Sequence, residues 1–355
     1  MTLSIAIRQQ LGPFSLDVAL ETGPGVTALF GRSGSGKTSL VNLVAGLSRP
    51  DQGRIVLDER TLVDTERSIF VPAGKRRIGY VFQEGRLFPH LSVRSNLLYG
   101  RWLTPQARRW GGLDEVVDLL GIGALMARMP RDLSGGEKQR VAIGRALLSS
   151  PDCLLMDEPL AALDRERKAE ILPFIERLRD AKRLPIVYVS HSVEEVARLA
   201  DTVALIEAGR VAAIGPVGEV FARLDAIGEW EAGAVLEATV LAQDPEAGVT
   251  RLDHPAGSLV VPSIDAPIGK RLRIRIRARD VTLAVGEPGR LSVRNRLRAE
   301  IVSIGEGRGQ DVGIRLSVGG EPMLARVTRD AVRDLELVPG LAVIALVKAV
   351  ALDGI

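Results

Sequence analysis

One stretch of sequence, VTALFGRSGSGKT at residues 26–38, decides the fold class of this 355-residue chain. Residues 26–30 are apolar and predict a short buried strand. From residue 38 onward, apolar residues recur three and four positions apart, as on one face of a helix. Between the two lies GRSGSGKT, which matches the phosphate-binding pattern GxxxxGK followed by Ser or Thr. Strand, loop and helix follow in the required order and therefore predict a nucleotide-binding α/β domain. Strands and helices alternate farther along the chain, with one helix expected at residues 113–120, and this alternation indicates a mostly parallel sheet.

The loop has the composition needed to hold a phosphate chain. Glycines let several backbone N–H groups point inward, and the following helix adds its positive N-terminal end. Lys37 is expected to reach the β- and γ-phosphates, and Thr38 to supply a hydroxyl to Mg²⁺. The loop residues predicted to bind ATP are Gly31, Arg32, Ser33, Gly34, Ser35, Gly36, Lys37 and Thr38.

A second apolar run, residues 153–156, ends in the acidic pair Asp157-Glu158. An acidic pair after a strand is often only a turn or a helix cap. Together with a phosphate loop, however, it indicates catalysis of phosphoryl transfer. Asp157 is expected to join the metal shell, and Glu158 to polarise an attacking water molecule.

A third motif, LSGGEKQR at residues 133–140, precedes a helical run. A Ser-Gly-Gly turn that opens a helix is a second anion site made of backbone donors and the helix dipole. One nucleotide does not need two such sites in the same chain. We therefore expect Ser134, Gly135, Gly136 and Glu137 to close over ATP held by a second copy, in a homodimer.

Over roughly residues 1–230, these ordered motifs resemble the ATP-binding cassette (ABC) family. The resemblance implies an α/β P-loop NTPase fold, an ABC ATPase core with a helical subdomain at about 87–150. It also implies three further site residues. Gln83 would be the Q-loop glutamine that senses the metal and the γ-phosphate, Asp164 would lie in the D-loop, and His191 would be the switch histidine. Taken alone, Gln83 could be a polar strand end and His191 a helix N-terminal residue.

Two positions depart from the family pattern. An aromatic residue usually precedes the phosphate loop and stacks on adenine. Phe14 is the candidate here, but it lies closer to the loop than the family pattern places it, and core packing is the alternative. The D-loop begins with Ala161 where Ser is frequent, which would remove one polar contact at the dimer interface.

The pattern of apolar and polar residues changes after about residue 234. Short β-like runs separated by turn signals replace helical periodicity, and they predict a small all-β, OB-like or barrel domain over 231–355. Residues 291–302, LSVRNRLRAEIV, resemble the molybdate-binding (Mop, or TOBE-type) domains, whose core would span about 290–352.

The start of this Mop-like stretch contains candidate ligands for an oxyanion. A tetrahedral dianion needs hydroxyls, N–H groups and a cation, and the candidates are Ser292, Arg294 and Asn295. The alternative is a plain strand start with solvated arginines.

Taken together, the resemblances imply the ATP-binding subunit of a molybdate or tungstate importer, with MgATP as substrate. Its partners would be a second copy, integral membrane permease subunits and, indirectly, a periplasmic oxyanion-binding protein. It would lie peripherally on the cytoplasmic face of the inner membrane. Sulfate, iron, polyamine or sugar importers are alternatives for the cargo. A non-transport ABC ATPase, or a β domain acting as a sensor, is an alternative of another class.

Composition argues against several other classes. The 47 basic and 44 acidic residues leave a net charge of +3, which is too balanced to indicate a nucleic-acid footprint. Arginines alternate with apolar residues over 270–279, but no aromatic residues are interleaved for base stacking, so no nucleic-acid partner is expected. The single cysteine, Cys153, excludes a disulfide framework. The N-terminus does not predict a signal peptide, and no stretch has the ~20 apolar residues that span a bilayer.

Overall fold

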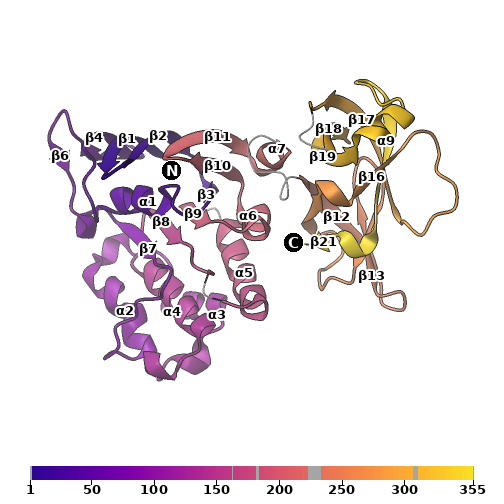
Figure 1. Ribbon diagram of the computed structural model, residues 1–355. Coiled ribbons are helices and arrows are strands. Elements are labelled where there is room, and N and C mark those ends of the chain that lie inside the picture. Colours follow the sequence, from indigo (N-terminus) through magenta and orange to yellow (C-terminus); the bar gives the residue numbers. More distant parts are fainter. Residues whose placement is uncertain (1, 162, 181–183, 223–232, 307–310, 355) are drawn as a thin grey trace. The chain divides into compact units, whose positions relative to one another are not determined.

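The computed structural model of the chain describes residues 2–161, 163–180, 184–222, 233–306 and 311–354. The chain divides into two compact units, Met1–Ile214 and Gly215–Ile355. Figure 1 follows it from the first unit, in indigo and magenta, to the second, in orange and yellow. The domain boundary predicted from the sequence, between residues 230 and 231, lies outside the described residues.

The first unit is built on an 11-stranded sheet with the order β6-β5-β4-β1-β2-β11-β10-β3-β9-β8-β7. Its strands are β1 (Leu3–Leu11), β2 (Phe14–Thr22), β3 (Gly25–Phe30), β4 (Gln52–Leu57), β5 (Arg60–Asp64), β6 (Ile69–Phe70), β7 (Ile78–Val81), β8 (Cys153–Asp157), β9 (Pro185–Ser190), β10 (Thr202–Glu207) and β11 (Arg210–Pro216).

This sheet is mixed, whereas the sequence suggested a mostly parallel one. The neighbours β10, β3, β9, β8 and β7 are parallel. By contrast, β1 pairs antiparallel with β2 and β4, and the series continues antiparallel through β5 and β6. The difference has a physical reason, since strands joined by tight turns, such as β1 and β2, can pair only antiparallel.

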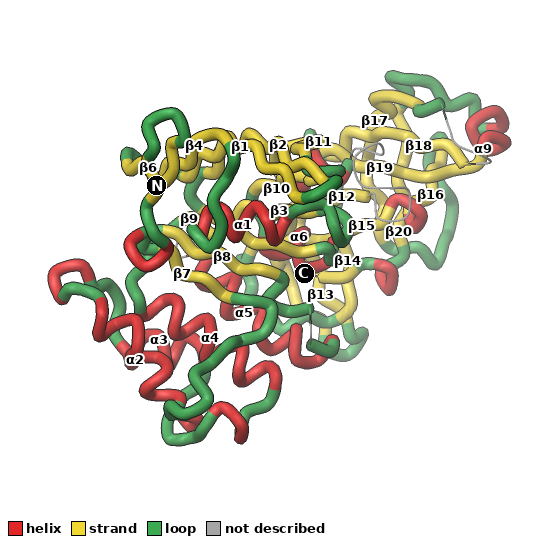
Figure 2. Tube along the Cα trace, turned by 60° about the vertical axis from the view of Figure 1, so that its left-hand side comes forward, coloured by secondary structure: helices red, strands yellow, loops and turns green. Residues whose placement is uncertain are grey.

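The parallel strands β3, β8 and β9 are buried along their whole length, as their continuous apolar runs predict. The helices of this unit are α1 (Lys37–Ala45), α2 (Val93–Leu103), α3 (Leu113–Leu120), α4 (Gly135–Leu148), α5 (Arg165–Asp180) and α6 (Val193–Leu199). Helices α2, α3 and α4 pack together at one end of the unit, as Figure 2 shows, in the stretch where a helical subdomain is expected. The helix predicted over 113–120 is confirmed.

The second unit contains two five-stranded sheets, ordered β14-β13-β12-β15-β21 and β16-β20-β17-β18-β19. The strands are β12 (Gly233–Asp244), β13 (Val249–Asp253), β14 (Leu259–Pro262), β15 (Arg271–Arg277), β16 (Val281–Ala284), β17 (Asn295–Ile304), β18 (Asp311–Val318), β19 (Glu321–Thr328), β20 (Ala342–Val347) and β21 (Asp353–Gly354). Among the described residues of this unit, the short helices α7 (Val217–Phe221) and α9 (Arg329–Asp334) accompany the strands. Both sheets contribute to one apolar core, and the predicted small β domain is confirmed.

The arginine-rich strand β15 shows why its sequence alternates. Leu272, Ile274 and Ile276 face the shared core, while Arg273 pairs with Glu237 across the sheet at 3.5 Å. The alternation therefore places the apolar side chains on the core face and the arginines on the other face, where Arg275 is also buried. Of the helices in the described residues, none is both long and apolar enough to cross a membrane.

Candidate active site

The phosphate loop, residues 31–38, joins β3 to α1 at the carboxyl end of a central parallel strand. Gly36 is the N-cap residue of α1 and has a φ of 100°, in the left-handed region that favours glycine. A Cβ atom at Gly36 would lie 2.9 Å from Leu16 Cδ1 and 3.1 Å from the Phe14 ring. Glycine is therefore required where the loop turns into the helix.

The side chain of Lys37 turns back into the loop. Its Nζ atom donates to the carbonyl oxygens of Gly31 and Arg32, both at 2.8 Å, and lies 3.4 Å from Ser35 Oγ. Burial lowers the pKa of Lys37, and the acidic pair at the end of β8 opposes that shift. The loop thus encloses a positive charge suited to phosphate oxygens. Its exposed tip consists of Arg32, Ser33 and Gly34.

The carboxylate of Asp157, at the carboxyl end of β8, contacts two other elements. Thr38 Oγ1 donates to Asp157 Oδ1 at 3.1 Å, and the Tyr80 hydroxyl lies 3.2 Å from Asp157 Oδ2. Burial raises the pKa of Asp157, while the two hydrogen bonds lower it. Burial and the nearby Asp157 raise the pKa of Tyr80, so the phenol keeps its proton. Sequence reasoning missed Tyr80, because nothing along the chain relates it to Asp157.

Thr38 and Asp157 fit the chemistry of a magnesium site. Mg²⁺ prefers hard oxygen ligands and usually binds one or two carboxylates together with substrate phosphates. Within the described ranges, no cluster of three or more His, Cys, Asp or Glu side chains could hold a metal ion. A magnesium ion beside Asp157 would therefore depend on phosphate oxygens as well as on protein ligands.

Glu158 and His191 meet at the ends of two adjacent parallel strands. Glu158 has a φ of +44°, and its N–H donates to the Val189 carbonyl at 3.1 Å. Its Oε1 atom lies 3.3 Å from Nδ1 of His191, the residue that follows β9. A left-handed backbone at a non-glycine residue costs about 1–2 kcal/mol and is common at functional sites. The structure thus brings together the two residues predicted to handle the attacking water and the γ-phosphate.

A buried carboxylate, Glu195, supports the turn that carries His191. It accepts hydrogen bonds from Tyr188 at 2.9 Å and Ser190 at 2.8 Å, and it pairs with Lys168 on α5 at 2.8 Å. Glu195 is only 4% exposed. Sequence reasoning missed this group, because a Glu in the first turn of a helix is ordinarily explained by the helix dipole.

Gln83 lies exposed after β7, beside a small groove. The preceding Phe82 carbonyl accepts a hydrogen bond from Gln139 of α4 at 3.3 Å. The groove has a volume of about 300 Å³ and is lined by residues that include Tyr80, Phe82, Arg86, Phe88, Tyr99 and Arg145. Both arginines lie over phenylalanine rings, Arg86 over Phe82 and Arg145 over Phe88. The result is a partly aromatic depression directly next to the predicted Q-loop.

Ser134 and Glu137 form a capping box at the start of α4. Ser134 N–H donates to Glu137 Oε2 at 2.7 Å, and Glu137 N–H donates to Ser134 Oγ at 3.2 Å. A Cβ atom at Gly135 would lie 3.3 Å from Leu163 Cδ2, close to the D-loop, while Gly136 is buried. No hydrogen bond or ion pair found among the described residues joins this turn to the phosphate loop of the same chain.

Asp164 stands at the start of α5. Its Oδ1 atom accepts the Arg167 N–H at 2.9 Å, and the two side chains approach to 3.6 Å. It is exposed, as is Ala161 of the D-loop. Ala162, also predicted to belong to the D-loop, lies outside the described residues.

The ring of Phe14 packs under the phosphate loop. It lies against the sites of Gly36 and Gly209, where an added Cβ atom would come within 3.1 Å of the ring. It also contacts the apolar core of the first unit. These contacts account for Phe14 by packing, and adenine stacking stays a prediction.

The oxyanion candidates in the second unit occupy different environments. Ser292 and Arg294 are exposed, whereas Asn295 is fully buried. Asn295 Oδ1 accepts the Val260 N–H at 2.6 Å, and its Nδ2 donates to the Val260 carbonyl at 3.0 Å. This differs from the expectation that the Asn295 amide would face an oxyanion, because both of its polar ends are used to join β17 to β14. That Ser292 and Arg294 bind an oxyanion stays a prediction.

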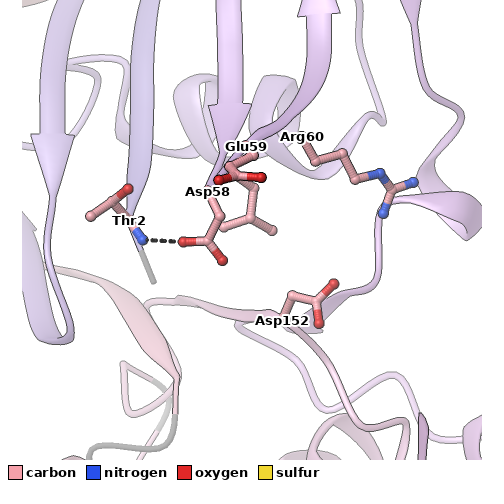
Figure 3. Close-up of a pocket in the computed structure, with 6 residues that line it drawn as sticks. Thr2, Asp58, Glu59, Arg60 and Asp152 are labelled. Atoms are coloured by element: carbon pink, nitrogen blue, oxygen red, sulfur yellow. Dashed lines mark hydrogen bonds between the residues drawn. The ribbon is translucent and has the colours of Figure 1, made fainter. Parts of the chain in front are cut away.

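A cavity of about 660 Å³, larger than the groove beside Gln83, lies at the amino end of β8, the end away from Asp157 (Figure 3). Asp152 of its lining precedes β8, whereas Asp157 ends the strand, roughly 16 Å away at the rise of an extended strand. Thr2 N–H donates to Asp58 at 2.7 Å across this cavity. Because nucleotides bind at the carboxyl ends of parallel strands, the larger cavity is not the nucleotide site.

Comparison with known families agrees with both units. Residues 15–161 match the ABC transporter family, and residues 291–353 match the TOBE domain. Among solved structures, a part of the ABC transporter complex cbiONQ from Clostridium perfringens is 27% identical, with a TM-score of 0.54 over 62% of this chain and 90% of that chain. A dimeric ATP-binding cassette with ADP and phosphate is 24% identical, with a TM-score of 0.50 over 61% of this chain and 98% of that chain, and shares the fold.

Curated relatives match along the whole chain. A protein of Rhizobium etli named "Molybdenum import ATP-binding protein ModC" is 54% identical over 100% of both chains. Proteins of the same name from Mesorhizobium japonicum and Rhodospirillum rubrum are 53% and 54% identical, over 99% of this chain and 96% and 97% of theirs. The chain therefore belongs to the ABC transporter ATP-binding proteins, in the family of the molybdenum import ATP-binding proteins.

Proposed function

We propose that this chain is the ATP-hydrolysing subunit of a molybdate importer and couples the hydrolysis of ATP to uptake of the oxyanion. The observation that carries the proposal is the contact of Glu158 with His191 beside that of Asp157 with Thr38. The relatives that share the whole chain are named for molybdenum import, and their name supports this cargo.

In this mechanism the phosphate loop holds the triphosphate through its backbone N–H groups. Lys37 exchanges its bonds to the loop carbonyls for bonds to the β- and γ-phosphates. Thr38 and Asp157, joined by Gln83, would hold Mg²⁺, which neutralises charge on the phosphates. Glu158 accepts a hydrogen bond from the attacking water and orients it, and His191 donates to the γ-phosphate from the neighbouring strand.

The turn at Ser134 completes the site on a second copy. Its Gly135 and Gly136 leave the N-terminal N–H groups of α4 unobstructed, and these groups favour an anion. A homodimer with two ATP molecules at its interface follows from this arrangement. Asp164 would lie at the same interface, next to the turn.

The groove beside Gln83 is our candidate for the contact with a permease. It is small and partly aromatic, and its arginines can meet the carbonyl end of an inserted helix. A contact there would place the chain peripherally on the cytoplasmic face of the membrane. A periplasmic oxyanion-binding protein would then deliver the cargo from the other side.

The proposal is tested by transport in vesicles that contain the chain and its permease, with the periplasmic oxyanion-binding protein supplied outside. We expect uptake of radiolabelled molybdate that requires ATP and Mg²⁺ inside the vesicle and is absent in Lys37→Ala. Unlabelled tungstate, sulfate or ferric iron is then added, and the degree to which each lowers the uptake of labelled molybdate ranks the possible cargoes. Uptake of another cargo, with molybdate neither carried nor competing, would overturn the molybdate assignment. ATP hydrolysis that stays indifferent to any permease would contradict the importer itself.

A further inference from the structure

Tyr80 joins three elements of the nucleotide site through its hydroxyl. It lies on β7, three residues before Gln83, and β7 pairs with the neighbouring strand β8. The hydroxyl lies 3.2 Å from Asp157 Oδ2 and 3.1 Å from the side-chain amide of Asn42, on α1. One phenol therefore contacts the helix that follows the phosphate loop and the strand that presents the metal carboxylate.

The register of the sheet explains this contact. Tyr80 pairs with Leu155 in the parallel ladder of β7 and β8. Asp157 follows Leu155 by two residues, so the side chains of Asp157, Leu155 and Tyr80 project from the same face of the sheet. A tyrosine is long enough to reach this diagonal neighbour with its terminal oxygen.

The phenol proton has one preferred acceptor. A phenol carries a single proton, and a carboxylate is a stronger acceptor than an amide oxygen. The Tyr80 phenol therefore donates its proton to Asp157. The Asn42 side chain then donates from its NH₂ group to the phenol oxygen, since the oxygen and nitrogen of an amide are assigned from such hydrogen-bond networks. Asp157 is then fixed at both oxygens, by Tyr80 at Oδ2 and by Thr38 at Oδ1.

We propose that Tyr80 is a positioning residue that orients the Asp157 carboxylate for magnesium. With Oδ2 held by the phenol, Oδ1 stays directed toward Thr38, where the metal and the phosphates would meet. Hydrogen bonds to ligating carboxylates commonly fix their orientation and raise metal affinity. This inference rests on the proposed function, because it deepens the role of the same site.

The test is a magnesium titration of nucleotide binding to the full-length chain. A fluorescent, non-hydrolysable ATP analogue is bound at a fixed concentration, and Mg²⁺ is increased from zero. Tyr80→Phe keeps the ring and loses only the hydroxyl. We expect its Mg²⁺ midpoint to rise by about 10-fold. Binding of the analogue in EDTA should stay within twofold of the wild type, because the phosphate loop is unaltered.

Tyr99→Phe is the matched control. Tyr99 lines the same groove as Tyr80, but it is 41% exposed and its ring packs against Phe88 rather than the site. Its Mg²⁺ midpoint should equal that of the wild type. Asn42→Ala, which leaves the phenol without its amide partner, should raise the midpoint by a smaller factor. It also provides a second readout if Tyr80→Phe proves unstable.

Two outcomes separate this inference from the proposed function. An unchanged Mg²⁺ midpoint in Tyr80→Phe and Asn42→Ala, with normal transport by the wild type, overturns the role of Tyr80 alone. Equal losses of binding with and without Mg²⁺ also overturn it, because they indicate a purely structural effect. Absence of ATP-driven uptake by the wild type would instead count against the importer, whatever the titration shows.

Discussion

Nδ1 of His191 lies 3.3 Å from Oε1 of Glu158, and each residue directly follows a buried strand in the parallel part of the same sheet. Asp157 pairs with Val189 in that ladder, so Glu158 comes one residue after this pair and His191 comes two residues after it. The positive φ of Glu158 turns its side chain toward His191 instead of continuing the strand. The histidine can therefore hold the glutamate in place as well as contact a phosphate.

Replacing His191 should impair the chemical step and spare nucleotide binding. We expect His191→Ala to lower kcat for ATP hydrolysis by about 100-fold or more, since a positioned proton-handling group contributes that much. The Kd for ATP should change by less than about threefold, because the phosphate loop is intact. Phosphate release and equilibrium binding measure the two quantities. His90→Ala, a change at another exposed histidine, is the control, and an unchanged kcat in His191→Ala would refute this role.

The capping box at Ser134 predicts a pH-dependent contribution to stability. The Ser134 backbone N–H holds the pKa of Glu137 below its ordinary 4.5, so the charged carboxylate stabilises the fold. This contribution is complete above the ordinary pKa and is lost as the pH falls through the lowered one. Glu137→Gln should cost about 0.5–1 kcal/mol at pH 7, and this difference should disappear once the pH has fallen below the lowered pKa of Glu137. Urea unfolding across this range is the measurement, and a gap independent of pH would contradict the prediction.

Arg76 should be a large contributor to the stability of the first unit. It is fully buried, and burial lowers its pKa to about 10, so it stays charged at pH 7. Its guanidinium donates to the carbonyl oxygens of Leu43, Val44 and Val71. Arg76→Met should cost about 2–3 kcal/mol, because these acceptors lose a charged donor. Arg49→Met, which removes the exposed arginine over the same Phe70 ring, should cost under about 1 kcal/mol in chemical denaturation. Equal losses would contradict the role of the buried hydrogen bonds.

Asn295 and Arg294 should separate structure from ligand binding in the second unit. Asn295→Ala leaves both backbone groups of Val260 without a partner and should cost about 2 kcal/mol. Arg294→Ala, at an exposed position, should leave thermal unfolding unchanged. If Arg294 contributes to an oxyanion site, the Arg294→Ala variant should unfold at the same temperature as the wild type but bind molybdate more weakly, as measured by calorimetry. A stable Asn295→Ala variant would show that the bridge to Val260 is dispensable.

Local spacing was enough to predict the parts of the site that are contiguous in sequence. Lys37 and Asp157 occupy the places expected from a loop after one strand and an acid at the end of another. The contact of Glu158 with His191 follows from the order of parallel strands, which the resemblance to a family implied and no local pattern shows.

The supporting residues could not be predicted, because their partners lie far away along the chain. Arg76 reaches carbonyls 32 and 33 residues earlier, and Glu195 pairs with Lys168, 27 residues earlier. A buried polar side chain looks like any surface residue until the packing around it is known. The same limit applies to Asn295, whose sequence context suggested a ligand and whose amide is bonded to the backbone of Val260.

The central claim is that ATP is enclosed between the phosphate loop of one copy and the Ser134 turn of another. Glu158→Gln keeps the shape of the site but removes the carboxylate that we propose orients the water, so ATP should remain bound and uncleaved. The most direct measurement is the mass of this variant in solution, by sedimentation, with and without ATP and Mg²⁺. The account predicts a monomer without nucleotide, a dimer holding two ATP molecules with it, and a return to monomer when Ser134→Arg is added. A variant that binds ATP yet stays monomeric, even with the permease supplied, would contradict the account.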